Sequence, residues 1–304
     1  MFRDFKDIEK YMIDNNIRAS VVVGGSHDDL ALPAIVRAKK EGIIEPILIG
    51  DAVKTEDLLR TLGEEPADYR IEDEKNEFKT ARKMVKMVLE GKAEVTMKGL
   101  MQSSSYLMAI RNPLGGLVKA DSLMNQVTVF YDPSQEKLVY VGDCAVNAFP
   151  TVEQRCEILR QIISLVELLG NDEPKIALLS AIEKPSPMIP SSVEAATMAT
   201  MNWGKVIVEG PMALDNALDA SAARHKGMDS KVAGQADILL VPDIHAGNIL
   251  HKAIHFFGHL PFGTLLLGDG FSAIFNSRTD DEDAKYYSIL LGVLCNAERR
   301  RKGL

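Results

Sequence analysis

Short apolar runs alternate with longer amphipathic stretches along almost the whole chain. The runs are short enough to be strands and are rich in Val, Ile and Leu, while the stretches between them carry apolar residues at helical spacing. This alternation predicts an α/β fold with a mostly parallel sheet. We expect strands at Ser20–Val23, Pro46–Ile49, Glu94–Met97, Val127–Tyr131, Lys137–Val141, Ile176–Ser180, Val206–Val208, Ile238–Val241 and Thr264–Leu267.

One pair of expected strands is not separated by a helix. Only Asp132-Pro133-Ser134-Gln135-Glu136 separates Val127–Tyr131 from Lys137–Val141, which is too short for a crossover connection, so we expect a hairpin. Elsewhere amphipathic helices link the strands, and the two clearest, Lys75–Glu90 and Val152–Leu169, are each followed by a glycine that favours a helix end.

The segment Lys205–Ala253 has the pattern of two buried strands joined by a helical crossover, which is typical of a parallel sheet. Gly210-Pro211 is expected to end the first strand, and an Ala-rich helix is expected from Asp215-Asn216. After the second strand we expect a turn over Asp243–Gly247 and a helix that starts near Asn248. The free N–H groups of such a helix start are suited to an anion.

Composition and charge narrow the class of protein. The chain has 304 residues, 46% hydrophobic and 26% charged, which is typical of a globular protein of two domains. Its net charge of −8 argues against a nucleic-acid surface but leaves room for local sites that bind small anions. Three unevenly spaced cysteines do not suggest a disulfide framework. With no signal-like start and no long apolar run, the expected location is the cytoplasm, without membrane contact.

Ser277 and Arg278 stand just before the last expected helix, Asp281–Arg300. Thr279 with Glu282 fits a capping box for this helix, and Asp280 is the alternative cap. A hydroxyl, a guanidinium and free backbone N–H groups would then meet at one place. That combination suits a phosphate group, because Arg presents a planar fork of donors and the helix start adds partial positive charge.

A second candidate site follows the strand Glu94–Met97. Lys98 and Gly99 lead into Ser103, Ser104 and Ser105, with a helix expected from about Tyr106. Open α/β sheets bind ligands at the carboxyl ends of parallel strands, so a point charge and hydroxyls there suit an anion. The simpler alternative is that one serine only caps the helix.

Two other features can be explained by an ordinary structural role. His251, His255 and His259 recur at helical spacing, but no acidic or thiol partner is evident, so we expect no metal site. Cys144 follows an expected strand, where a nucleophile is chemically possible, although a free cysteine is most often buried and inert.

Ordered sequence blocks from about residue 90 to 290 carry a resemblance to a known family. These blocks are Met97-Lys98-Gly99, Asp143-Cys144-Ala145-Val146-Asn147, Leu178-Leu179-Ser180-Ala181, Val208–Ala217, Lys231–Pro242, Ala246–Lys252 and Ser277-Arg278-Thr279-Asp280. Together they resemble the phosphate acetyl/butyryltransferase family, and the chain length and the segment after Lys98 look closer to the phosphate butyryltransferase branch.

The resemblance implies a two-domain fold like that of the isocitrate/isopropylmalate dehydrogenases, with the active site in an interdomain cleft. The first domain would be 1–126 plus 277–304, and the second 127–276. The implied reaction is acyl-CoA + phosphate ⇌ acyl phosphate + CoA, reversible, with a short acyl group such as butyryl transferred directly in a ternary complex. The expected partners are acyl-CoA, inorganic phosphate, acyl phosphate and further copies of the chain in a homodimer or higher homo-oligomer. CoA would be a substrate, and no cofactor would be required.

The resemblance also implies roles for individual residues. Arg278 would neutralise charge on the reacting carbonyl oxygen while Ser277 fixes phosphate oxygens. An acid after the Ser-Arg pair would serve as base, and the spacing leaves Asp280 and Asp283 both open. The remaining expected substrate contacts, with phosphate in the segment after Lys98 and with CoA in the later blocks, are Lys98, Gly99, Ser103, Ser104, Asn147, Gly247, Asn248 and Lys252.

The sequence also departs from the family pattern at three places, one of which is the segment Arg111-Asn112-Pro113-Leu114-Gly115-Gly116. No arginine follows the serine-rich segment before Arg111, and His245 stands where an acidic residue is common. Two alternatives therefore stay open, a non-catalytic CoA-binding relative and a metal- and NAD-dependent dehydrogenase on the same fold.

Overall fold

The computed structural model describes residues 2–119 and 122–303, and internal contacts divide them into two compact units. The terminal unit combines Phe5–Ser122 with Pro261–Leu304, and the central unit is Leu123–Leu260 with residues 2–4. The domain division expected from the sequence, 1–126 plus 277–304 and 127–276, remains a prediction, as does an interdomain cleft.

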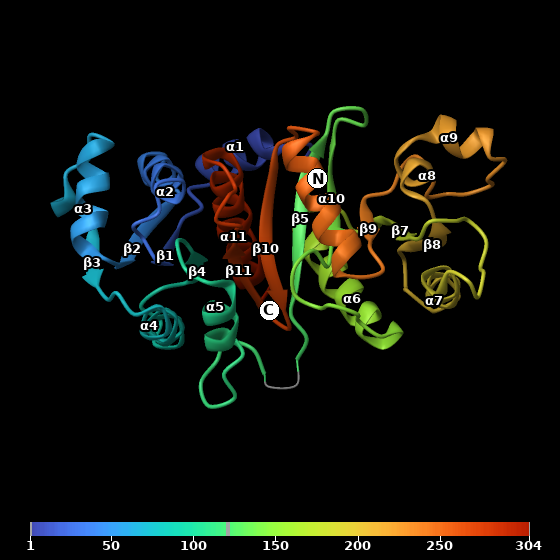
Figure 1. Cartoon of the computed structure of the whole chain (residues 1–304). Coiled ribbons are helices and arrows are strands. Elements are labelled where there is room, and N and C mark those ends of the chain that lie inside the picture. The colour runs from blue at the N-terminus through green and yellow to red at the C-terminus, as the bar shows by residue number, and fades with distance from the viewer. Residues whose placement is uncertain (1, 120–121, 304) are drawn as a thin grey trace. The chain divides into compact units, whose positions relative to one another are not determined.

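The terminal unit is built on a sheet with strand order β3-β2-β1-β4-β11-β10. Neighbours from β3 to β11 run parallel, and β10 is antiparallel to β11. Figure 1 shows α2 and α11 on one face of this sheet and α4 and α5 on the other. The elements are α1 (Phe5–Asp14), β1 (Ala19–Gly24), α2 (Ala31–Lys40), β2 (Ile44–Gly50), α3 (Ala52–Thr61), the 3₁₀ turn η1 (Pro66–Asp68), β3 (Arg70–Asp73), α4 (Glu77–Leu89), β4 (Val95–Lys98), α5 (Ser103–Ile110), β10 (Phe262–Gly268), β11 (Phe271–Phe275) and α11 (Glu282–Lys302).

The register of this sheet decides where its polar residues gather. Gly24 at the end of β1 pairs with Lys98 at the end of β4, and Lys98 pairs with Phe275 at the end of β11. Three parallel strands therefore end at the same level, and the segments that follow them leave from one edge of the sheet. This edge is where open α/β sheets bind ligands.

The central unit has strand order β5-β6-β9-β7-β8, with β5 and β6 antiparallel and the other neighbours parallel. Its helices α6 and α10 run beside the parallel part (Figure 1). The elements are β5 (Asn125–Asp132), β6 (Lys137–Gly142), α6 (Val152–Leu168), β7 (Lys175–Leu179), α7 (Pro190–Ala199), β8 (Ile207–Met212), α8 (Leu214–Leu218), α9 (Ala220–His225), β9 (Ile238–Leu240) and α10 (Ile244–Phe256).

Every strand expected from the sequence is present, and the hairpin of β5 and β6 is confirmed. Two strands were not expected. The strand β3 reads Arg-Ile-Glu-Asp and is largely exposed at the sheet edge, so it lacks an apolar run. The strand β11 is short, and Asp269-Gly270 joins it to β10 in a tight antiparallel hairpin, for which Asp-Gly is a signal in the sequence.

Four local expectations are wrong. Gly210-Pro211 lies inside β8 and does not end it, because β8 is an edge strand and proline is tolerated there. The Ala-rich helix is interrupted at Asp219, which caps α9 after α8 has ended. Helix α10 starts at Ile244 with Asp243 as its N-cap, so Asn248 lies within the helix and offers no free helix start. His259 lies beyond the end of α10 at Phe256, so it does not share a helix face with His251.

Candidate functional site

The segments that leave β1, β4 and β11 bring ionisable side chains together in the terminal unit. We call Asp28, Lys98, Arg278, Asp280 and Lys285 the charged cluster. Asp28 and Lys98 are each 2% exposed, Lys285 is 1% exposed and Asp280 is fully buried, while Arg278 is exposed. Burying four ionisable groups in one place is costly unless they compensate one another, so the cluster is an unusual feature of this sheet edge.

Lys285 links the cluster to two segments. Its Nζ lies 3.4 Å from Oδ2 of Asp28 and 3.4 Å from the carbonyl oxygen of Ser277. The other carboxylate oxygen of Asp28 accepts hydrogen bonds from the backbone N–H groups of Leu30 and Ala31 at the start of α2. The lysine therefore ties the segment after β11 to the segment after β1.

Lys98 is the second buried lysine of the cluster. Its Nζ donates to the carbonyl oxygens of Gly99 and Met101, at 3.3 Å each, and lies 5.9 Å from the centre of the Phe275 ring. Burial and, after it, the positive charge of Lys285 lower the pKa of Lys98 to about 8, while the carboxylate of Asp28 acts in the opposite direction. An anion entering the cluster would favour the charged form of this lysine.

The turn that carries Ser277 and Arg278 is held at both ends. Before it, Nδ2 of the buried Asn276 donates to Oγ1 of Thr264 at 3.1 Å and to Oγ of Ser288 at 2.8 Å. After it, the side chain of Asp281 caps α11 by accepting from the N–H of Ala284. The cap is thus neither Asp280 nor Thr279, because Asp280 is turned inward to the N–H of Ser277.

The two candidate acids behave differently. Asp280 is buried, and its Oδ2 accepts from the backbone N–H of Ser277 at 2.8 Å. Asp283 is exposed on the first turn of α11, where its Oδ1 lies 3.1 Å from Nη1 of Arg37 in α2. The structure therefore brings Asp280, and not Asp283, into contact with the turn of Ser277 and Arg278.

The segment after β4 differs in detail from the expectation. Helix α5 starts at Ser103, earlier than expected, with Gln102 in the N-cap position, and both Ser103 and Ser104 are exposed in its first turn. A Cβ atom at Gly99 would lie 2.6 Å from the carbonyl oxygen of Gly25, so glycine is required where the segments after β1 and β4 cross.

In the central unit, the predicted substrate residues gather around Asp143 at the end of β6. Its carboxylate accepts from the backbone N–H groups of the loop that follows, and Asn147 lies within this loop and donates through Nδ2 to the carbonyl of Met124 at 2.7 Å. Burial raises the pKa of the Asp143 carboxyl, and the N–H donors oppose that rise.

Helix α10 supplies the other predicted residues of this unit. Nδ2 of Asn248 donates to the carbonyl of Cys144 at 3.3 Å, and a Cβ at Gly247 would lie 2.2 Å from the carbonyl oxygen of Asp143. Asn147, Gly247 and Asn248 are thus brought together by the loop after β6. Lys252 lies further along the helix, 6.0 Å from the centre of the Phe256 ring.

The structure also places Cys144 and His251, the two features for which the sequence suggested other chemistry. Cys144 is fully buried, and burial raises the pKa of its thiol to about 12, so it is poorly placed to act as a nucleophile. Within residues 2–119 and 122–303 there is no group of His, Cys, Asp and Glu side chains arranged to hold a metal ion. Nδ1 of His251 lies 3.1 Å from the hydroxyl of Thr128.

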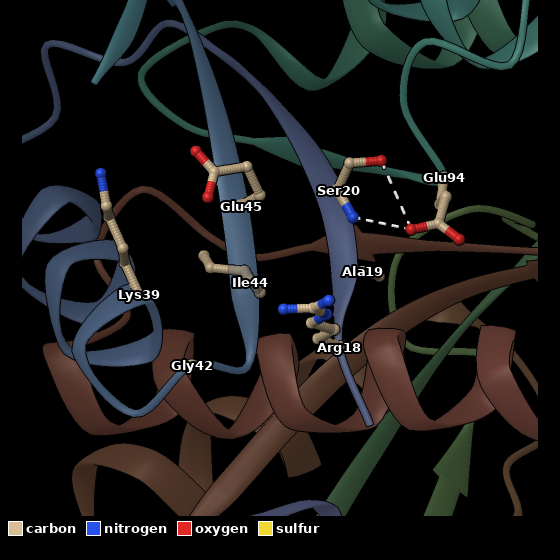
Figure 2. Close-up of a pocket in the computed structure, with 8 residues that line it drawn as sticks. All are labelled: Arg18, Ala19, Ser20, Lys39, Gly42, Ile44, Glu45 and Glu94. Carbon is tan, nitrogen blue, oxygen red and sulfur yellow. Dashed lines mark hydrogen bonds between the residues drawn. The ribbon is translucent and has the colours of Figure 1, made fainter. Parts of the chain in front are cut away.

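A pocket of about 480 Å³ lies at the opposite edge of the terminal sheet. Figure 2 shows it beside the starts of β1 and β2, with Arg18, Lys39 and Glu45 around it and Glu94 hydrogen bonded to Ser20. Because parallel strands begin at this edge and end at the other, the pocket is separate from the charged cluster.

Two members of the cluster, Asp28 and Lys285, were missed from the sequence. Asp28 follows the glycines at the end of β1, so the rule that ligands meet the carboxyl ends of strands could have found it. Lys285 gives no such signal, because a lysine in an amphipathic helix normally lies in solvent.

A parallel sheet that gathers cations, buried carboxylates and a restrained Ser-Arg turn at its carboxyl edge defines a class of α/β proteins that handle anionic substrates. The family described as "Phosphate acetyl/butaryl transferase" matches residues 55–293. The chain belongs to this family of phosphate acetyl/butyryltransferases and is an acyltransferase, which acts on acyl-CoA and phosphate.

Individual relatives agree with this assignment. A phosphate butyryltransferase of Clostridium acetobutylicum is 33% identical over 97% of this chain and 98% of its own length. A crystal structure of a branched-chain phosphotransacylase from Enterococcus faecalis matches with a TM-score of 0.80 and 28% identity, covering 91% of this chain and 98% of that one. The fold is also similar to that of a putative 4-hydroxythreonine-4-phosphate dehydrogenase from Salmonella typhimurium, with a TM-score of 0.52 and 13% identity, over 91% of this chain and 99% of that one. The expected dehydrogenase-like α/β fold is thereby confirmed.

Among the described residues, no helix has the length and apolar character needed to span a bilayer.

Proposed function

We propose that this protein transfers a short acyl group such as butyryl directly between CoA and phosphate, and that the charged cluster binds the phosphate. The observation that carries the proposal is the charge balance of the cluster. Three cationic side chains, Lys98, Arg278 and Lys285, face two carboxylates, those of Asp28 and Asp280. With Lys98 protonated, one positive charge is left for an anionic substrate.

The proposed chemistry uses this excess charge. An oxygen of the phosphate dianion attacks the thioester carbonyl carbon, negative charge develops on the carbonyl oxygen, and the carbon–sulfur bond then breaks. The proton of the phosphate ends on the departing CoA sulfur, so the products are acyl phosphate dianion and CoA thiol. The exposed guanidinium of Arg278 is the group placed to stabilise the developing oxyanion, because its backbone turn is held while its side chain is accessible.

The position of Cys144, which follows β6, supports direct transfer. Cys144 is buried among the residues after β6, so a covalent acyl-cysteine would require it to become exposed. Between the candidate acids, contact with the Ser277 turn favours Asp280 as the acid that works with Arg278. The proposed CoA contacts are Asn147, Gly247, Asn248 and Lys252 of the central unit.

The decisive experiment measures CoA release as a function of added phosphate, with acetyl-, propionyl-, butyryl-, isobutyryl- and isovaleryl-CoA. Branched substrates are included because a structural relative is a branched-chain phosphotransacylase. We expect phosphate-dependent release that is fastest with butyryl-CoA, and an Arg278→Ala enzyme slower by about 10²-fold to 10³-fold in kcat. Arg60→Ala is a matched control, because Arg60 is an exposed arginine paired with acids on α3.

Three outcomes would contradict parts of the proposal. No phosphate-dependent release with any of the acyl-CoA substrates would reject phosphate acyl transfer, and an unchanged kcat in Arg278→Ala would reject the role of that residue. Exchange of labelled CoA into acyl-CoA without phosphate would reveal an acyl-enzyme and would reject direct transfer. The homodimer or higher homo-oligomer remains a prediction, and sedimentation at several protein concentrations tests it.

A further inference from the structure

The ion pair of Lys285 and Asp28 is almost completely buried, with side chains 1% and 2% exposed. A buried pair of this kind contributes little net stability, because removing both charges from water offsets their attraction. At 3.4 Å its geometry is also looser than that of a short, well-aligned charge-assisted hydrogen bond. Fold stability alone is therefore a weak reason for this pair.

The position of Lys285 in its helix is also not explained by stability. It stands in the first turn of α11, which begins at Glu282, and the start of a helix favours anions over cations. Side chains in a helix lean toward the N-terminal end, which directs the ammonium group of Lys285 back toward the turn before the helix. There it meets the carbonyl oxygen of Ser277.

We propose that Lys285, held in place by Asp28, is a positioning residue for acyl transfer that fixes the turn of Ser277 and Arg278 and keeps a second cation beside Lys98. This inference rests on the proposed function. The turn has a hydrogen bond from Ser277 to Asp280 on its amide side, and Lys285 restrains the same residue through its carbonyl. Without the lysine, the Ser277 carbonyl in the peptide before Arg278 keeps the hydrogen bond from the Asp280 N–H at 3.2 Å but loses the contact with Nζ of Lys285 at 3.4 Å.

The second part of the role is electrostatic. The charged groups that face Lys98 are Lys285 on α11, Asp28 after β1, and Arg278 and Asp280 in the turn after β11. After burial, Lys285 is the largest cause of the lowered pKa of Lys98. Removal of that charge raises the pKa of Lys98, whereas a change that only loosened the helix would leave it where it was.

The test compares Lys285→Met and Lys285→Arg with the wild-type enzyme in the phosphate-dependent CoA release assay. A misplaced Arg278 is expected to lower kcat of Lys285→Met by about 10²-fold. Its activity should persist to higher pH than that of the wild type, because Lys98 keeps its proton longer. Lys285→Arg, which retains the charge, should recover at least about tenfold of the lost kcat.

Lys137→Met is the matched control, because Lys137 forms a largely buried ion pair with Asp237 in the central unit, outside the proposed site. It should unfold more readily but keep the kcat and pH profile of the wild type. If Lys285→Met does not fold, the double variant Asp28→Asn/Lys285→Met replaces it, because asparagine can still accept the N–H bonds at the start of α2. The same fall in kcat is expected of the double variant, but its pH profile should shift less, because the Asp28 carboxylate that raises the pKa of Lys98 is removed as well.

The outcomes separate the two proposals. A wild-type enzyme without phosphate-dependent CoA release overturns the proposed function and, with it, the role of Lys285 in that reaction. An active wild type together with a folded Lys285→Met, or double variant, of unchanged kcat, phosphate KM and pH profile overturns the inference alone. A fall in kcat that Lys285→Arg does not relieve, with no change in the pH profile, also overturns it.

Discussion

The backbone N–H of Ser277 donates to Oδ2 of Asp280 at 2.8 Å, and the N–H of Asp280 donates back to the Ser277 carbonyl at 3.2 Å. This reciprocal pair closes the turn that presents Arg278. Because the buried Asp280 carboxylate makes this contact, its removal leaves the partly buried N–H of Ser277 without its acceptor.

Asp280→Ala should therefore lose far more activity than Asp283→Ala. We expect the first variant to lower kcat by about 10²-fold, since it loosens the turn and removes a negative charge beside the cluster. Asp283→Ala should stay within about twofold of wild type, because Asp283 is exposed and pairs with Arg37 on α2. Steady-state assays on both purified variants make the comparison, and the reverse order of effects would identify Asp283 as the important acid.

Lys98→Met should be inactive and yet more stable than the wild type. The folded-state pKa of Lys98, about 8, lies below its ordinary value of 10.5, so at pH between these values the unfolded chain binds more protons and the wild type gains stability as pH rises. The free-energy cost of keeping Lys98 charged while buried is fully present below pH 8. At such pH, replacing Lys98 by methionine should raise the free energy of unfolding by about 1–3 kcal/mol.

Denaturant unfolding at pH 7 and pH 10 measures this difference. The advantage of Lys98→Met should be largest at pH 7 and should shrink at pH 10, as the wild-type lysine loses its proton in the folded state. An advantage of equal size at both pH values would show that burial of the charge is not its cause.

Cys144→Ala should keep near-normal turnover. The thiol is fully buried and its pKa is raised to about 12, so it is neither accessible nor ionised at neutral pH. A thiol reagent should likewise leave Cys144 unmodified in the folded enzyme. Loss of turnover by more than about tenfold in a variant that is as stable as the wild type would contradict direct transfer.

Gly247→Ala should destabilise the protein. An added Cβ would lie 2.2 Å from the carbonyl oxygen of Asp143, so α10 would have to move away from the loop after β6. Overpacking of this kind costs about 1–3 kcal/mol. Thermal unfolding measures the loss, with Gly42→Ala as a comparison, since a Cβ at Gly42 meets no atom within 4 Å although its φ of +72° adds strain of its own. A Gly247→Ala enzyme as stable as the wild type would indicate that glycine is not required for packing.

Most strands were predictable, because a buried strand shows its burial in its own apolar residues. β1 is buried at almost every position, and its run of three valines shows this without any partner. β3 was not predictable, because this exposed edge strand has no apolar run of its own. β11 could have been found from its buried Ala-Ile-Phe run and the Asp269-Gly270 turn before it. Gly210-Pro211 suggested a strand end because glycine and proline are local signals that interrupt strands. Only the edge position of β8 explains why the strand continues through them.

The site was predictable in part. Ser277, Arg278 and Lys98 could be found because each follows a strand or precedes a helix, and these boundaries have sequence signals. The choice between Asp280 and Asp283 could not be made, since both lie within a few residues of the Ser-Arg pair and differ only in the direction of their side chains.

By itself the sequence determined the α/β class, the family and the residues at the ends of the strands, because periodicity and short motifs are local properties of a chain. The tertiary structure alone decided that Lys285 and Asp28 are buried together beside Lys98. Charge interactions depend on distance through space and on exclusion of water, and neither is visible in the order of residues.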